Sequence, residues 1–102
     1  MGKHVTFWKM KVKPGKLDEL RSVMNDPKEE ARIKAAGWQM TVIGSRKDNP
    51  EEVWGMVTWD TSDRYYKNAE SPDQDKDYQK MMQFMAGEPE WFDCDLVEES
   101  RA

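Results

Sequence analysis

The chain has 102 residues, of which 37% are hydrophobic and 35% charged, and its net charge is −4. This length fits one compact domain, residues 1–102, with no second independent core. No apolar run approaches the roughly 20 residues of a transmembrane helix, and the basic side chains are scattered, so we expect neither membrane insertion nor nucleic-acid binding.

The first strand is predicted over residues 4–13, where apolar and polar side chains alternate. Trp8, Met10 and Val12 fall on one face and lysines on the other, and a Pro-Gly pair ends the strand. Helical periodicity follows over residues 16–36. Asp26 and the proline after it have the pattern of a fresh N-cap, which predicts two helical pieces that Gly37 terminates.

Two strands over residues 38–46 and 53–59 then form a predicted hairpin, because the segment between them is rich in turn-forming residues. Trp38, Met40 and Val42 are expected on one face of the first of these strands.

A short helix is predicted after the N-cap residues 60–62, and Ser71 with its following proline interrupts it. The next helix carries methionines at helical spacing. The last strand is predicted over residues 91–98, with Phe92 and Cys94 on its apolar face and Cys94 buried.

This order predicts an α+β fold, the ferredoxin-like β-α-β-β-α-β arrangement, with a four-stranded antiparallel sheet covered by helices on one face. The first and last strands are then neighbours. On the open face we expect Lys9 and Lys11 opposite Asp95 and Asp93.

Ile43, Trp54 and Met56 are also expected on the open face of the sheet. Such a face is usually covered by another surface. A homodimer with its sheets face to face is therefore predicted.

The chain contains eight Met, five Trp, three Tyr and three Phe. These side chains form either a bulky core or the lining of a cavity for a flat apolar ligand, and composition alone supports both. The single cysteine excludes an internal disulfide, and the start of the chain lacks a signal-peptide pattern, so a cytoplasmic location is expected.

Several short motifs occur in a characteristic order: Val-Lys-Pro-Gly-Lys at 12–16, Gly37, Val-Thr-Trp-Asp-Thr-Ser at 57–62, and Ser-Pro at 71–72. Over about residues 4–98 this pattern resembles the antibiotic biosynthesis monooxygenase (ABM) domain of the dimeric α/β-barrel superfamily. The resemblance implies a homodimer whose sheets form a barrel, with a pocket between sheet and helices in each subunit. Characterised members include cofactor-free monooxygenases of aromatic polyketides, heme-degrading enzymes and domains without assigned activity.

The resemblance implies catalytic roles for Trp59, which matches the tryptophan ending the family's third strand, and for Tyr65, which resembles a tyrosine of the cofactor-free oxygenases. Gly55 stands where those oxygenases carry an asparagine. The heme-degrading branch has an axial histidine on its second helical region, and here no histidine follows His4, so heme degradation is not expected.

The predicted function is therefore a cofactor-independent monooxygenase that oxidises a small phenol or hydroquinone, which itself supplies electrons to dioxygen. The protein is expected to favour the deprotonated substrate and to exclude water. Tyr65 or Tyr66 is expected to donate a hydrogen bond to the developing oxyanion. The expected substrate-binding residues are Trp8, Met10, Tyr66, Met82 and Phe92. No cofactor and no metal is expected.

Three alternatives stay open on the sequence. In the first, the protein is a non-catalytic ligand-binding or structural homodimer that uses the same pocket, an alternative that Gly55 favours. In the second, the pocket carries out another cofactor-free transformation, such as isomerisation. In the third, the aromatic residues only pack the core.

Two further sets of residues carry weaker signals. His4 is a candidate general base but is expected to be an exposed residue at the start of a strand. Asp73, Asp75 and Asp77 imitate the start of a calcium loop, yet Tyr78 replaces its glycine, so they are expected to form a solvated first helical turn.

Overall fold

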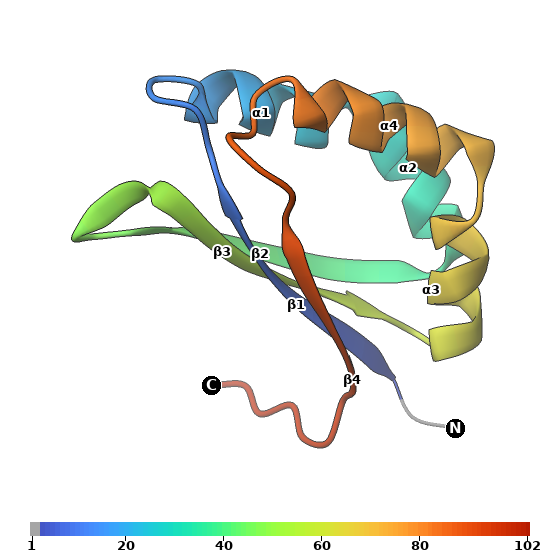
Figure 1. The fold of residues 1–102 in the computed structure, drawn as a ribbon. Helices are drawn as coiled ribbons and strands as arrows, with labels where there is room; N and C mark the ends of the chain where they lie inside the picture. The colour runs from blue at the N-terminus through green and yellow to red at the C-terminus, as the bar shows by residue number, and fades with distance from the viewer. Residues whose placement is uncertain (1–2) are drawn as a thin grey trace.

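The computed structural model describes residues 3–102; Met1 and Gly2, which belong to the stretch inspected for a signal peptide, lie outside the described residues. The elements in chain order are β1 (His4–Lys11), α1 (Leu17–Met24), α2 (Pro27–Ala36), β2 (Trp38–Arg46), β3 (Asn49–Trp59), α3 (Ser62–Ala69), α4 (Pro72–Met82) and β4 (Glu90–Asp95). The strands form one antiparallel sheet in the order β2-β3-β1-β4, and the helices cover one face of it (Figure 1). The predicted α+β ferredoxin-like arrangement is confirmed.

The helix breaks follow local capping chemistry. The Asp26 side chain accepts a hydrogen bond from the Lys28 amide, with proline at the first position of α2. Ser71 caps α4 in the same way, again followed by proline, and Thr61 caps α3. Because each cap satisfies a backbone N–H that the helix itself leaves unpaired, these short helices start where the sequence predicts.

Gly37 connects the helical layer to the sheet. Its φ is 120°, and a Cβ atom there would lie 2.5 Å from Asp60 Oδ1. Its carbonyl oxygen accepts a hydrogen bond from the Asp60 amide at 3.0 Å. This close approach, which only glycine permits, fixes the end of α2 against the end of β3, just before α3 begins.

A β-bulge changes the faces of β2. The register shifts between Trp38 and Met40. Trp38 pairs with Trp59 on the helix side, whereas Val42 is 49% exposed on the open side. The prediction of one shared face was wrong, because an extra residue in one strand reverses the alternation beyond it. Ile43 likewise packs against the core instead of facing outward.

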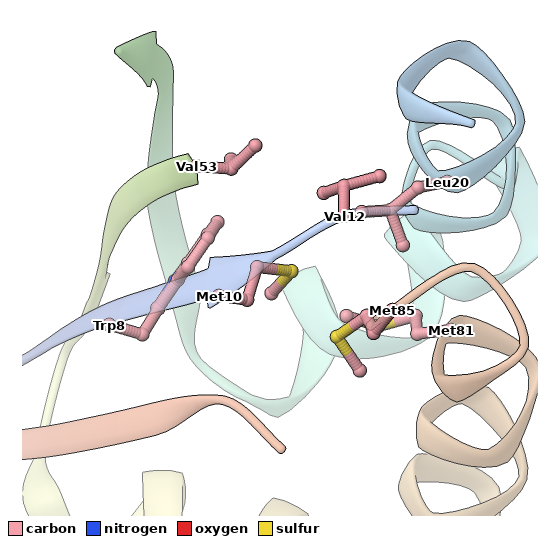
Figure 2. Packing of buried hydrophobic residues seen from close by; sticks show 7 residues of the cluster. All are labelled: Trp8, Met10, Val12, Leu20, Val53, Met81 and Met85. Carbon is pink, nitrogen blue, oxygen red and sulfur yellow. The ribbon is translucent and has the colours of Figure 1, made fainter. Parts of the chain in front are cut away.

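The hydrophobic core lies between the sheet and the pair α1 and α4. Figure 2 shows its seven buried members, which come from β1, β3, these helices and the residues just beyond β1 and α4: Trp8, Met10, Val12, Leu20, Val53, Met81 and Met85. The predicted inward face of β1 is thereby confirmed. Met85 lies beyond the end of α4, in a short bridge to Val12.

The register of β4 contradicts the predicted pairing with lysines. Thr6 pairs with Asp93 and His4 with Asp95, which places both carboxylates on the helix side of the sheet, and Lys9 pairs with Glu90. Because alternate residues face opposite sides, Phe92 and Cys94 lie on the open face. Cys94 is exposed, not buried as expected.

The open face carries large apolar side chains beside charged ones such as Lys9 and Glu90, as predicted, but its apolar members differ. Its exposed large side chains are Phe7, Val42, Trp54 and Phe92, each between 44% and 49% exposed. Met56 pairs with Phe7 and Val42 and so belongs to the same face. Within residues 3–102, no helix combines the length and apolar character needed to cross a membrane.

Candidate functional site

A cavity of about 710 Å³ lies between the sheet and the helices. This volume is within the range of small-molecule sites, roughly 300–1,000 Å³. Its aromatic lining consists of Trp8, Trp38, Trp59, Tyr65, Tyr66, Tyr78 and Trp91. Three methionines, Met10, Met24 and Met81, are also part of the lining.

Most of the sequence-predicted site residues converge on this cavity. Its lining includes Trp8, Met10, Trp59, Tyr65 and Tyr66. Met82 is half-buried beside the hydrophobic core and is not part of the lining. Phe92 lies on the opposite face of the sheet, where it pairs with Phe7. Phe92 therefore faces away from the cavity, whereas Met82 packs against the core on the helix side.

Trp59 and Tyr65 form an aromatic pair in the lining of the cavity. Trp59 ends β3 and is 3% exposed, and its ring meets that of Tyr65 edge-on with centroids 5.9 Å apart. Tyr65 stacks on the His4 imidazole at 4.1 Å. Burial raises the pKa of Tyr65, so its hydroxyl keeps its hydrogen at neutral pH.

His4 is buried, with 2% of its surface exposed, so the expectation of an exposed chain end was wrong. Its Nδ1 atom is 2.9 Å from Ser62 Oγ, and its Nε2 atom is 2.6 Å from Thr6 Oγ1. Thr6, itself fully buried, donates its hydroxyl hydrogen to Asp93 Oδ1 at 2.9 Å. Tyr66 donates to the other oxygen of Asp93 at 3.0 Å.

The directions of these bonds fix the tautomer of His4. An ionised carboxylate only accepts, and Thr6 has one hydrogen to give. Thr6 Oγ1 therefore accepts from His4 Nε2–H, and Nδ1 of the neutral ring accepts from the Ser62 hydroxyl. The chain Ser62, His4, Thr6, Asp93 thus ends on a carboxylate that lines the cavity.

Sequence reasoning missed this polar chain. The alternation of a strand does place His4, Thr6 and Trp8 on one face of β1, and it places Asp93 and Phe92 on opposite faces of β4. The register between the two strands, which no single segment reveals, was needed to bring Thr6 and Asp93 together.

The state of His4 makes the stability of the protein depend on pH. Burial lowers the pKa of His4 below 6.5, and the carboxylates of Asp93 and Asp95 oppose this only partly. The unfolded chain therefore takes up a proton near pH 6.5 that the folded chain does not. Stability contributed by neutral His4 is present above pH 6.5 and is lost as the pH falls below it, at up to about 1.4 kcal/mol per pH unit.

This effect is measurable as the difference in unfolding free energy between wild type and His4→Gln, obtained from urea titrations between about pH 5 and 8. We expect the advantage of the wild type to shrink toward pH 5. Asp77, which titrates in the same window, is present in both proteins and cancels in the difference. A difference that stays constant with pH would contradict a buried neutral imidazole.

A second polar group lies on the helical wall of the cavity. Glu29 accepts a hydrogen bond from Arg32 at 2.8 Å, and Arg32 also lies 3.6 Å from Asp77 and 2.8 Å from the Asn68 side-chain oxygen. Burial and the hydrogen bond to Glu29 raise the pKa of Asp77 to about 6. Asp77 is thus part of a half-buried carboxyl pair, whereas Asp73 and Asp75 are exposed in the first turn of α4, as expected.

Gly55 lies directly against the Trp8 indole. A Cβ atom at this position would lie 2.1 Å from Cζ2 of Trp8. The tryptophan therefore occupies the space that any side chain at Gly55 would need, and the polar groups of the cavity come from other elements. Among residues 3–102, no three His, Cys, Asp or Glu side chains are placed to hold a metal ion together.

No family model matches the sequence, and no curated protein matches it either. Solved structures with the same fold are numerous. A "putative antibiotic biosynthesis monooxygenase" from Caulobacter crescentus CB15 is 20% identical, with 95% of this chain and 92% of that chain covered and a TM-score of 0.79. A dimeric ferredoxin-like protein from an uncultured marine organism is 16% identical, with 100% and 94% covered and a TM-score of 0.78.

A third structure is a variant of SnoaB, a cofactor-independent oxygenase from Streptomyces nogalater. It is 13% identical, with 98% of this chain and 97% of that chain covered and a TM-score of 0.70. Sequence identities this low establish a shared fold and leave activity open. The chain therefore has the fold of the antibiotic biosynthesis monooxygenases, as the sequence motifs predicted.

Proposed function

We propose that this protein is a cofactor-independent monooxygenase that inserts one oxygen atom into a small electron-rich phenol. The observation that carries the proposal is the aromatic-lined cavity whose lining includes Trp59, Tyr65 and Asp93. A flat phenol fits against the indole rings, and its hydroxyl reaches polar groups there. The description of SnoaB as a cofactor-independent oxygenase supports the same reaction class.

The reaction needs no external reductant. A phenol with a free para carbon reacts with dioxygen to give the para-quinone and water, and the substrate supplies all four electrons. One oxygen atom bonds to the para carbon, and the other leaves as water with the hydrogens of the hydroxyl and of that carbon. The protein's part is to hold the ring, accept and return a proton, and keep bulk water from the peroxide intermediate.

Oxygen uptake tests this proposal. With anthrone or 1,5-dihydroxynaphthalene, the wild type is expected to consume oxygen and form quinone faster than buffer. Trp59→Phe combined with Tyr65→Phe should lower the rate at least about tenfold, because the first change removes the indole that packs against the substrate and the second removes the hydroxyl that donates a hydrogen bond to it. Val97→Ala is the control and should retain the wild-type rate, because Val97 is exposed beyond the end of β4 and is not part of the lining.

A double variant with unchanged turnover would show that Trp59 and Tyr65 do not belong to the active site.

The second candidate function is a ligand-binding dimer without catalysis, which the packing of Trp8 over Gly55 favours because β3 then offers no polar group at that position. Saturable quenching of tryptophan fluorescence by planar aromatics, without oxygen uptake, would support it.

We also propose that the active form is a homodimer with its two open faces in contact, located in the cytoplasm. The exposed aromatic residues Phe7, Trp54 and Phe92 support the interface, and the solved dimeric ferredoxin-like protein of the same fold is consistent with it. A reducing compartment suits the exposed thiol of Cys94.

A further inference from the structure

The charged groups that line the cavity all have the same sign. They are Glu29, Glu30, Asp75, Asp77 and Asp93, and none of the lining side chains in the described part of the chain is Lys, Arg or His. Arg32 stands behind this lining, paired with Glu29 at 2.8 Å. A carboxylate or phosphate ligand would lose its hydration and meet like charges, whereas a neutral hydrogen-bond donor would meet acceptors.

Among these groups, Asp93 is the carboxylate whose two oxygens both accept hydrogen bonds from other side chains. Its two oxygens accept one hydrogen bond each, from Thr6 and from Tyr66. A carboxylate accepts about four such bonds, so both oxygens keep acceptor capacity. The Asp93 side chain is exposed at the β4 edge while belonging to the cavity lining, and the buried pair His4 and Thr6 sets its orientation.

From these observations we infer that Asp93 accepts the hydroxyl hydrogen of the substrate, and that the cavity selects neutral hydroxyaromatic compounds over aromatic carboxylates. The inference rests on the proposed function for the reaction that follows binding. It differs from the expectation that the protein favours a deprotonated substrate, because an acidic lining opposes a stable phenolate.

The proton instead moves as oxygen adds. The O–H bond of the phenol breaks and Asp93 takes the proton, while electrons of the ring pass to dioxygen and a C–O bond forms at the para carbon. Asp93 then returns the proton to the distal peroxide oxygen. The para C–H bond and the O–O bond then break together: the C–H electron pair forms the quinone carbonyl, and the departing hydroxide takes the para proton and leaves as water. Asp93 ends the cycle ionised.

Binding measured without oxygen tests the inference apart from catalysis. Three ligands of similar shape are titrated by calorimetry under argon: 2,6-dihydroxynaphthalene, 2,6-dimethoxynaphthalene and 6-hydroxy-2-naphthoate. The diol is expected to bind at least about tenfold more tightly than the other two, because a hydrogen bond to a charged acceptor is involved. Failure of the diol to bind, or equal affinity for the naphthoate, would overturn the inference.

Asp93→Asn removes the charge with little change in shape. It should weaken diol binding and strengthen naphthoate binding, each by about tenfold. Asp95→Asn is the matched control, since Asp95 lies on the same face of β4 and is not part of the lining; it should leave the ratio of affinities unchanged. An Asp93→Asn protein with the wild-type ratio would overturn the inference.

The two proposals fail separately. Selective, Asp93-dependent binding without oxygen uptake would refute the monooxygenase and leave the ligand class standing. Oxygen uptake that depends on Trp59 but not on Asp93 would support the monooxygenase and refute the role of Asp93.

Discussion

Gly55→Ala is expected to destabilise the protein by about 3 kcal/mol, at the upper end for overpacking a core. The added methyl carbon would lie 2.1 Å from Cζ2 and 2.4 Å from Cε2 of Trp8. Trp8 is 3% exposed and belongs to the hydrophobic core, with β1 and β3 paired directly at these two residues. The indole cannot withdraw without moving its neighbours in the core, so either the sheet distorts or the ring leaves its place.

Urea unfolding measures this effect, with Gly44→Ala as the matched control. Gly44 lies in β2, and a Cβ atom there meets nothing within 4 Å. Its substitution should change stability by less than about 0.5 kcal/mol.

The smaller Trp8→Leu should rescue part of the Gly55→Ala loss, so that the double variant costs less than the sum of the two single changes. Additive costs would show that Trp8 is not what the methyl group meets. A Gly55→Ala protein as stable as the wild type would show that the indole does not fill this space.

Local chemistry explains which parts of the fold the sequence predicts. The breaks at Asp26 and at Ser71 depend on residues within one helical turn, and both occur where expected. The alternation along β1 also needs no distant information. The predicted face of Ile43 was wrong, because the bulge after Trp38 shifts the register by one residue. Such a shift moves every later side chain of the strand to the opposite face.

The residues of the candidate site also fall into those that the sequence predicts and those that depend on strand pairing. The family motifs point to Trp59 and Tyr65, and the structure places both at the cavity. The polar chain from His4 to Asp93 could not be predicted from the sequence, because it depends on the pairing of β1 with β4. Thr6 and Asp93, for example, are 87 residues apart in the chain. Phe92 was misassigned for the same reason, since its apolar character alone does not say which face of the sheet is covered.

Charging the open face is expected to dissociate the proposed homodimer. Phe7 and Phe92 are direct cross-strand partners on this face, 44% and 48% exposed in the single chain. The double variant Phe7→Glu and Phe92→Lys places opposite charges side by side, which preserves attraction within one chain. In a face-to-face dimer the same charges lose water, and two aromatic contacts per subunit are lost as well.

We expect the dimer dissociation constant to rise at least about thousandfold, equivalent to roughly 4 kcal/mol. Light scattering after size exclusion, from about 1 to about 100 µM, should give twice the 12.0 kDa chain mass for the wild type and the single-chain mass for the variant. Lys28→Glu changes a charge in the helical layer, away from the open face, and should leave the dimer intact.

A wild type that is monomeric at the highest concentration would refute the homodimer. A charged variant that still dimerises would place the interface elsewhere on the molecule. Since the cavity lies on the helix side of the sheet, the dissociated variant also tests whether one chain alone binds 2,6-dihydroxynaphthalene. Retained binding is expected, because every residue assigned to the site belongs to the same chain.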